Sequence, residues 1–171
     1  PPPRMSDAPR LLAGREEAAR WAASQRALGH RVVFTNGVFD LLHPGHLDSL
    51  RRARAEGDVL VVGVNSDSSV QRLKGPGRHI LPEGQRLRLL AALEMVDAVV
   101  AFDEDTPALT IQAVAPDVLA KGGHYTVPEI VGHEFVLGRG GRVLSLPLLP
   151  GQSTTGIIER VLRAFPPQAT A

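Results

Sequence analysis

The sequence contains no cysteine, which excludes disulfide bonds, thiol catalysis and cysteine-ligated metal centres. No apolar run approaches the roughly 20 residues that a membrane-spanning helix needs, and the first residues lack the apolar core of a signal peptide. The formal net charge is only +1, so no broad basic face for nucleic acid is expected. These absences favour a cytoplasmic protein that binds neither membranes nor nucleic acids.

Lysine is nearly absent as well. Lys74 and Lys121 are the only lysines among 19 basic residues, and each is followed by glycine. Arginine and lysine are not interchangeable where a compact charge must meet a phosphate, so a chain that otherwise uses arginine has a reason to keep an ammonium at these places. Chance in so small a count is the alternative. We interpret both lysines as phosphate contacts.

Continuous apolar runs alternate with segments of helical periodicity along the 171 residues. The apolar runs predict strands at 31–34, 58–64, 98–102, 117–120 and 142–146. The periodic segments predict helices at 15–28, 47–56, 69–73, 82–93, 106–114, 128–137 and 157–164. This order indicates an α/β fold, namely a Rossmann-like, open, doubly wound, five-stranded parallel sheet with helices on both faces.

The length suits one domain, which we place at residues 15–164. Residues 1–14 and 165–171 are expected to be tails, and residues 1–4, which precede Met5, to be a remnant of expression. The glycine-rich turn at 138–141 does not predict a dinucleotide site, because the glycine pattern is incomplete and lies between a helix and a strand in the wrong order.

The stretch 35–46 joins the first predicted strand to the next helix. His43 and His46 lie three residues apart around Pro44 and Gly45, at the start of that helix. Ligands of parallel sheets bind beyond the carboxyl ends of the strands, and a helix N-terminus attracts phosphate. Histidines at this spacing are also found as metal ligands or as plain surface residues. The strand–turn–helix context favours a phosphate site.

Other polar segments are expected at the same rim of the sheet. Asn36 and Asn65, the only two asparagines, each lie just past a predicted strand. The last helix opens with three consecutive hydroxyl residues, Ser153, Thr154 and Thr155. Hydroxyls at a helix start are often capping groups only. Beside histidines and lysines at one rim, a second phosphate cradle is the better interpretation, and two helix N-termini facing one crevice suit a triphosphate.

The sequence resembles the HxGH nucleotidylyltransferase superfamily, and most closely its adenylyltransferases that act on D-glycero-β-D-manno-heptose 1-phosphate. The resemblance runs over about 31–161, and its matching segments are 35–46, 64–67, 72–75, 85–86, 92–97, 105–107, 121–123 and 153–155. The HxGH motif marks only the superfamily, whereas Arg-Leu-Lys-Gly and Lys-Gly-Gly are more specific to this branch. Two residues depart from it: Val38 replaces a common cysteine, and His124 replaces the usual aspartate, an acceptor-only carboxylate.

The resemblance implies in-line attack of a sugar phosphate oxygen on the α-phosphorus of ATP. It implies catalytic roles for His43, His46 and Lys74. Implied nucleotide and phosphate contacts are Thr35, Asn36, Gly37, Phe39, Gly45, Lys121, Ser153, Thr154 and Thr155. Candidates for contacts with the nucleotide or the sugar are Asp40, Asn65, Asp67, Arg86, Gly122 and His124. For Asp40 an organising role in the turn, and for Arg86 a structural role, are equally good interpretations.

The resemblance further implies Mg²⁺ on the substrate phosphates, with no protein metal ligand named, because Mg²⁺ rarely has an all-protein cage. It also implies a homodimer and a free-standing enzyme, rather than one fused to a sugar kinase. Small molecules, a nucleoside triphosphate and a sugar phosphate, are the expected partners.

Two other functions compete with this interpretation. A cytidylyltransferase for glycerol 3-phosphate or ethanolamine phosphate would share the histidine motif, but it usually carries an arginine shortly before the hydroxyl segment. Here that place, 148–152, reads Leu-Leu-Pro-Gly-Gln. A non-catalytic nucleotide-binding module is disfavoured because both histidines, both lysines and the hydroxyl segment are intact.

Overall fold

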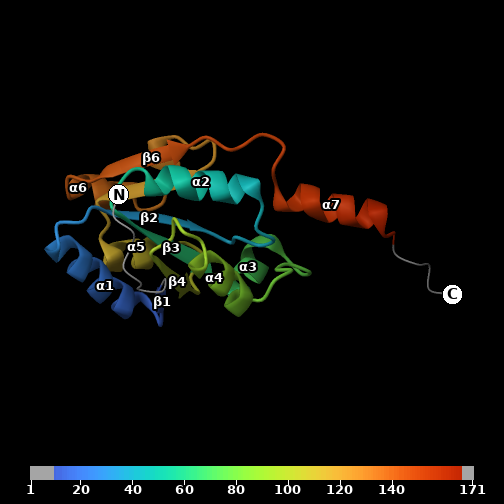
Figure 1. Ribbon diagram of the computed structural model, residues 1–171, viewed down its shortest axis with the longest axis horizontal. Coiled ribbons are helices and arrows are strands. Elements are labelled where there is room, and N and C mark those ends of the chain that lie inside the picture. Colours follow the sequence, from blue (N-terminus) through green and yellow to red (C-terminus); the bar gives the residue numbers. More distant parts are fainter. Residues whose placement is uncertain (1–9, 167–171) are drawn as a thin grey trace.

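The computed structural model describes residues 10–166 and shows one sheet of six parallel strands in the order β1-β4-β3-β2-β5-β6 (Figure 1). The strands are β1 (Arg10–Leu12), β2 (Val32–Gly37), β3 (Val59–Asn65), β4 (Ala98–Phe102), β5 (Val118–Gly122) and β6 (Arg142–Leu146). The helices are α1 (Arg15–Ala27), α2 (Pro44–Arg54), α3 (Asp67–Lys74), α4 (Glu83–Ala91), α5 (Ala108–Val114), α6 (His133–Gly138) and α7 (Thr154–Ala164), with a 3₁₀ turn η1 (Val127–Glu129).

The sheet has one strand more than predicted. β1 pairs with β4 through the registers Arg10 with Ala98 and Leu12 with Val100. This strand lies inside the segment 1–14 that was expected to be a tail, so the tail prediction is wrong for residues 10–12. Three residues are too few to show a strand period, and only pairing with the β4 edge identifies them. The expected remnant at 1–4 and most of the expected tail at 165–171 lie outside the described residues.

Helices cover both faces of the sheet, as predicted, because alternate residues of the strands supply two separate cores. On one face Phe34, Val61 and Val100 pack with Trp21 of α1 and Val114 of α5. On the other face the strand residues Val33, Val62 and Val99 pack with residues of α2 and α4, among them Leu50 and Leu90. The doubly wound arrangement therefore follows from strands that are apolar on both sides.

The segment 128–137 was predicted as one helix, and the structure corrects this to η1 followed by α6. Gly132 separates the two pieces with a φ of 89°, a left-handed conformation that side chains rarely adopt. A Cβ at this position would lie 2.9 Å from Ile111 Cδ1, so α5 also approaches too closely for a larger residue. Backbone geometry at one glycine thus divides the predicted helix.

The order of the strands determines where the loops at their carboxyl ends meet. The chain leaves β2 toward β3 and β4, then returns to β5 and β6 on the other side of β2. The crevice outside the carboxyl ends of β2 and β5 is therefore the switch point at which such sheets bind ligands. Within residues 10–166, no helix has the length and apolar character that crossing a membrane requires.

Candidate active site

A cavity of about 670 Å³ opens at this switch point. Most of the residues predicted from the sequence to form the site line it: Thr35, Asn36, Gly37, Phe39, Asp40, His43, Gly45, His46, Asn65, Lys74, Lys121, Gly122, Ser153, Thr154 and Thr155. Asp67, Arg86 and His124 are absent from its lining. The convergence of four distant segments at one rim is thereby confirmed, whereas their binding roles stay predictions.

The turn between β2 and α2 presents two stacked histidines. His43 is the N-cap residue of α2 in extended conformation, and Pro44 begins the helix, three residues earlier than the sequence predicted. The rings of His43 and His46 lie 3.8 Å apart between centroids and 23° from parallel. Phe39, in the left-handed region at φ 53°, presents its ring to His46 in an edge arrangement at 5.3 Å. The turn thus fixes both imidazoles against the start of a helix.

Burial keeps both histidines neutral at physiological pH. Loss of solvation lowers the pKa of His43 below its ordinary value. Loss of solvation and the neighbouring His43 lower the pKa of His46 to about 4, against a smaller opposing effect of Asp40. The Nδ1 atoms of both rings are buried, and neither has a hydrogen-bond partner in the described part of the chain. Buried polar atoms are normally paired, so these rings are suited to a ligand.

Two ammonium groups contribute positive charge to the cavity. Lys121, near the end of β5, donates a hydrogen bond from Nζ to the Asn36 carbonyl oxygen at 3.1 Å. Burial, and then the charge of Lys74, lower the pKa of Lys121. Lys74 ends α3, where Gly75 caps the helix with a φ of 83°. Two like charges near each other favour an anion between them, which agrees with the phosphate interpretation of the lysines.

The N-terminus of α7 reaches the cavity next to α2. Ser153 Oγ accepts a hydrogen bond from the Gly156 N–H at 3.0 Å, which makes it an N-cap. Thr154 Oγ1 donates to the Asp40 carbonyl oxygen at 2.9 Å, so α7 is attached to the histidine turn. The capping interpretation of the hydroxyls is therefore correct for Ser153, and the same residues also line the cavity. The starts of α2 and α7 therefore line the same cavity, through Gly45 and His46 and through Thr154 and Thr155.

Asp40 organises a loop rather than offering a free carboxylate. Its side chain is buried and accepts hydrogen bonds from the backbone N–H groups of Ile80 (2.7 Å) and Leu81 (2.9 Å). Both carboxylate oxygens are thereby used, one for each N–H. The structure supports the organising role for this residue.

Arg86 and Asp67 form the support behind the cavity. The Arg86 side chain is fully buried and donates to the carbonyl oxygens of Leu81, Val38 and Asn65 and to Asp67 Oδ1, at 2.8 to 3.0 Å. Asp67 Oδ1 also accepts from the Glu83 N–H at 2.8 Å. Arg86 therefore joins the ends of β2 and β3 to the start of α4, and of its two interpretations the structure favours the structural one.

Several lining residues were not predicted from the sequence. They include Ser49, Arg78, Asp105, Thr106 and Gln152. Asp105 and Thr106 follow β4 closely, so their place past a predicted strand was a usable signal. Arg78 lies in a loop rich in glycine and proline, where the sequence has no periodic pattern that predicts which side chains face the cavity. His124, in contrast, is exposed and outside the cavity lining, so its departure from the usual aspartate does not change the lining.

A doubly wound parallel sheet with an HxGH turn facing a cationic cavity defines an α/β domain of the nucleotidyltransferase class. A family model described as Cytidylyltransferase-like matches residues 34–160. The chain belongs to this family.

Similar proteins agree with this placement. The Bifunctional protein HldE of Halorhodospira halophila is 54% identical over 155 residues, which cover 91% of this chain and 31% of that protein. The protein of the same name from Pelobacter propionicus is 49% identical over 160 residues, or 94% of this chain and 33% of the relative. The chain thus spans about a third of the length of these curated relatives.

Two solved structures are also similar. The lipopolysaccharide core biosynthesis protein from Thermoplasma volcanium has a TM-score of 0.57 and 31% identity, covering 71% of this chain and 98% of that one. Pantoate-beta-alanine ligase from Francisella tularensis has a TM-score of 0.54 at 13% identity, covering 90% of this chain and 79% of that one. The second similarity shows the fold alone.

Proposed function

We propose that the chain transfers AMP from ATP to D-glycero-β-D-manno-heptose 1-phosphate, giving ADP-heptose and pyrophosphate. The observation that carries the proposal is the neutral, stacked pair His43 and His46 at the start of α2, facing a cavity that also holds Lys74 and Lys121. The sequence resemblance to heptose 1-phosphate adenylyltransferases supports the acceptor, as do relatives of about 50% identity named HldE.

The reaction needs charge stabilisation more than a base. The acceptor phosphate is largely ionised at neutral pH, since its second pKa is about 6. Its oxygen forms a bond to the α-phosphorus of ATP while the bond from that phosphorus to the bridging oxygen breaks, and the electron pair leaves with pyrophosphate. Preorganised donors at the α-phosphate then provide most of the rate enhancement.

Each part of the cavity has a role in this scheme. His46 and His43 donate hydrogen bonds to α-phosphate oxygens, and neutral rings can do so through one N–H each. Lys121 balances charge on the triphosphate, whose β- and γ-phosphates meet the N–H groups and hydroxyls at the start of α7. Lys74 attracts the acceptor phosphate. Thr35 and Asn36, at the end of β2, contact the α-phosphate or the incoming phosphate.

Mg²⁺ is proposed to bind through the phosphates of ATP, where it would reduce their negative charge. Among residues 10–166 no group of three or more histidine, aspartate or glutamate side chains is placed to hold a metal ion.

A cytidylyltransferase for a polyol phosphate is the less favoured alternative. The segment 148–152 lacks the arginine usual there, and the family description does not fix the nucleobase. Pyrophosphate release should be measured with ATP or CTP, each with heptose 1-phosphate, glycerol 3-phosphate or no acceptor. Release only with ATP and heptose 1-phosphate is expected. Release with CTP and glycerol 3-phosphate would contradict the proposed substrates. Absence of pyrophosphate release in every combination, from folded protein, would favour a non-catalytic nucleotide-binding module.

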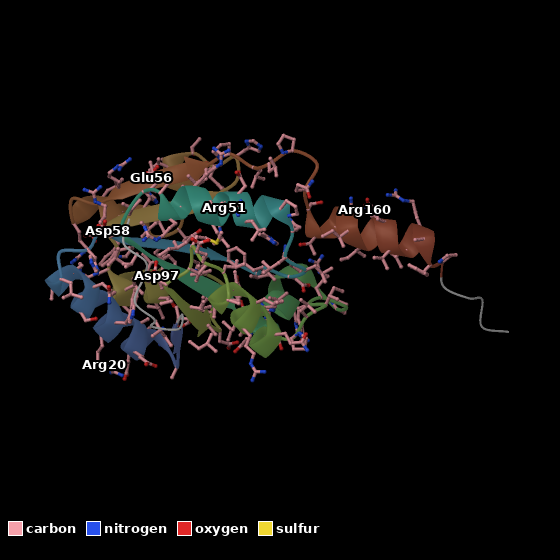
Figure 2. All side chains as sticks on the ribbon, viewed as in Figure 1. Arg20, Arg51, Glu56, Asp58, Asp97 and Arg160 are labelled. Atoms are coloured by element: carbon pink, nitrogen blue, oxygen red, sulfur yellow. The ribbon has the colours of Figure 1, made fainter. Side chains whose placement is uncertain are left out.

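We also propose that the chain is a homodimer of the cytoplasm, where ATP is available. Within the described part of the chain, α7 has no buried residue, and Val161, Leu162 and Phe165 are more than half exposed. The helix extends away from the sheet, with Arg160 on it clear of the body (Figures 1 and 2). Sedimentation should give twice the mass of 18.3 kDa; the change Leu162→Glu should then shift the protein toward monomer, and a monomeric wild type would refute the dimer.

A further inference from the structure

Arg78 is a cation of the cavity whose guanidinium makes no hydrogen bond or ion pair with residues 10–166. It lines the cavity with Lys74 and Asn65, and its Nε atom is buried without a hydrogen bond in the described part of the chain. A buried guanidinium nitrogen normally donates a hydrogen bond. We propose that Arg78 binds the phosphate of the acceptor and so determines affinity for the sugar phosphate; this inference rests on the proposed function.

The acidic side chains nearby are already engaged elsewhere. Asp105, which also lines the cavity, accepts from Arg72 Nε at 2.8 Å. Glu129 accepts from the backbone N–H and the hydroxyl of Thr126. The carboxylate of Asp40 is occupied by two backbone N–H groups. The charge of Arg78 is therefore left for a ligand, and a phosphate dianion matches the fork of a guanidinium.

The loop that carries Arg78 is held in place on its C-terminal side. Asp40 accepts from the N–H groups of Ile80 and Leu81, and Arg86 Nε donates to the Leu81 carbonyl oxygen at 3.0 Å. His79 Nε2 lies 3.2 Å from Asp67 Oδ1. Arg78 thus extends from an anchored backbone rather than from a free loop, which reduces the entropy lost when it binds a ligand.

Topology assigns Arg78 to the acceptor rather than to ATP. In-line transfer requires the incoming oxygen and the leaving pyrophosphate on opposite sides of the α-phosphorus. Lys121 lies near the carboxyl end of β5, on one side of β2, and the start of α7 is attached to the turn after β2 through Thr154 and Asp40. Lys74 and Arg78 follow β3, on the other side. With the α-phosphate at the start of α2, between them, Arg78 and Lys74 lie where the acceptor phosphate must enter.

The test is a set of four proteins: wild type, Arg78→Ala, Arg78→Lys and the control Arg88→Ala. Arg88 is an exposed arginine on α4, close in sequence but outside the cavity lining, so its variant makes the same change of charge. Arg78→Ala should raise the KM for heptose 1-phosphate about tenfold to a hundredfold, as expected for a lost charge-assisted hydrogen bond. The KM for ATP should change less than about twofold, Arg78→Lys should recover part of the affinity, and Arg88→Ala should resemble wild type.

Calorimetric titration with heptose 1-phosphate separates the two proposals. If wild type turns over this substrate and Arg78→Ala binds it equally well, the inference on Arg78 fails and the proposed function stands. A raised KM for ATP in Arg78→Ala would assign the residue to the triphosphate and also overturn the inference. If wild type neither binds nor turns over heptose 1-phosphate, both proposals fail together. Thermal melting of each variant confirms folding, which is expected because Arg78 side-chain atoms make no described hydrogen bond.

Discussion

His43 and His46 stack with ring centroids 3.8 Å apart at the first turn of α2. Two charged imidazoles at this distance would repel each other, and the repulsion adds to the loss of solvation that lowers the pKa of His46 to about 4. The stack is therefore a neutral pair of donors beside the positive end of a helix. Under the proposed function, the pair would stabilise negative charge on a phosphate without having to lose a proton.

The change His46→Ala should reduce turnover by roughly 10²–10³-fold, the usual effect of removing one preorganised donor to a developing oxyanion. The melting temperature should change little, because the His46 ring donates to no group of the described chain and its Nδ1 has no partner. Steady-state pyrophosphate release and thermal melting measure the two effects. The control His30→Ala removes an exposed histidine that contacts Gln25 and is absent from the cavity lining. An active His46→Ala enzyme would remove this residue from the mechanism.

Acid should destabilise the protein through the same residue. The pKa of His46 is 6.5 in its ordinary state and about 4 in the folded protein. Between these values the unfolded chain binds a proton that the folded chain does not, so stability is fully present above pH 6.5 and is lost as pH falls toward 4. From pH 7 to pH 5 this contributes a loss of about 2 kcal/mol.

Urea unfolding at pH 7 and pH 5 measures this loss. The variant His46→Asn should show a smaller decrease in the free energy of unfolding than wild type, by about that 2 kcal/mol. The pKa of His43 is also lowered by burial, but His43 is present in both proteins, so its contribution is common to the two measurements. An equal decrease in wild type and variant would show that His46 titrates normally in the folded chain.

The sheet could be predicted from the sequence because its strands are buried on both faces and read as continuous apolar runs. The bounds 98–102 and 142–146 agree with β4 and β6. β1 was not predicted because three residues are too few to show the alternating pattern of a strand. The prediction of a single helix at 128–137 was wrong because Gly132 adopts a left-handed conformation. Both errors depend on tertiary neighbours, namely the edge of β4 and the side chain of Ile111.

The site was predictable where a residue stands at the end of a strand. Asn36, Asn65 and Lys121 are each the last residue or the last but one of β2, β3 and β5, and all three line the cavity. The sequence left open whether Arg86 contacts ligand or supports the fold, because the carbonyl oxygens that it binds are distant in sequence, up to 48 residues away. Arg78 was missed because hydrogen bonds to Asp40 set the path of its loop.

Replacing Arg86 with leucine should lower the free energy of unfolding by about 3–5 kcal/mol, because it leaves Asp67 without its buried partner and removes the donor to three carbonyl oxygens. Denaturant unfolding measures this effect. The control Arg88→Leu changes an exposed arginine on the same helix and should stay within about 0.5 kcal/mol of wild type. A stable Arg86→Leu protein that had lost only activity would instead support a ligand contact.

Gly45 lies between the two histidines and leaves little room for a side chain. A Cβ there would lie 3.0 Å from His43 Nδ1 and 3.0 Å from Gln152 Cβ, so Gly45→Ala must displace the His43 ring, the segment before α7, or both. Turnover should fall, by less than the roughly 10²-fold that a misplacement of about 1 Å causes, because the contacts of the new Cβ require only a small shift of the ring. Stability should change less than activity, because alanine favours the helix and offsets part of the crowding. The control Gly84→Ala has nothing within 4 Å of its Cβ and should keep full activity while gaining stability. Near-normal turnover in Gly45→Ala would mean that the position of the His43 ring does not govern the reaction.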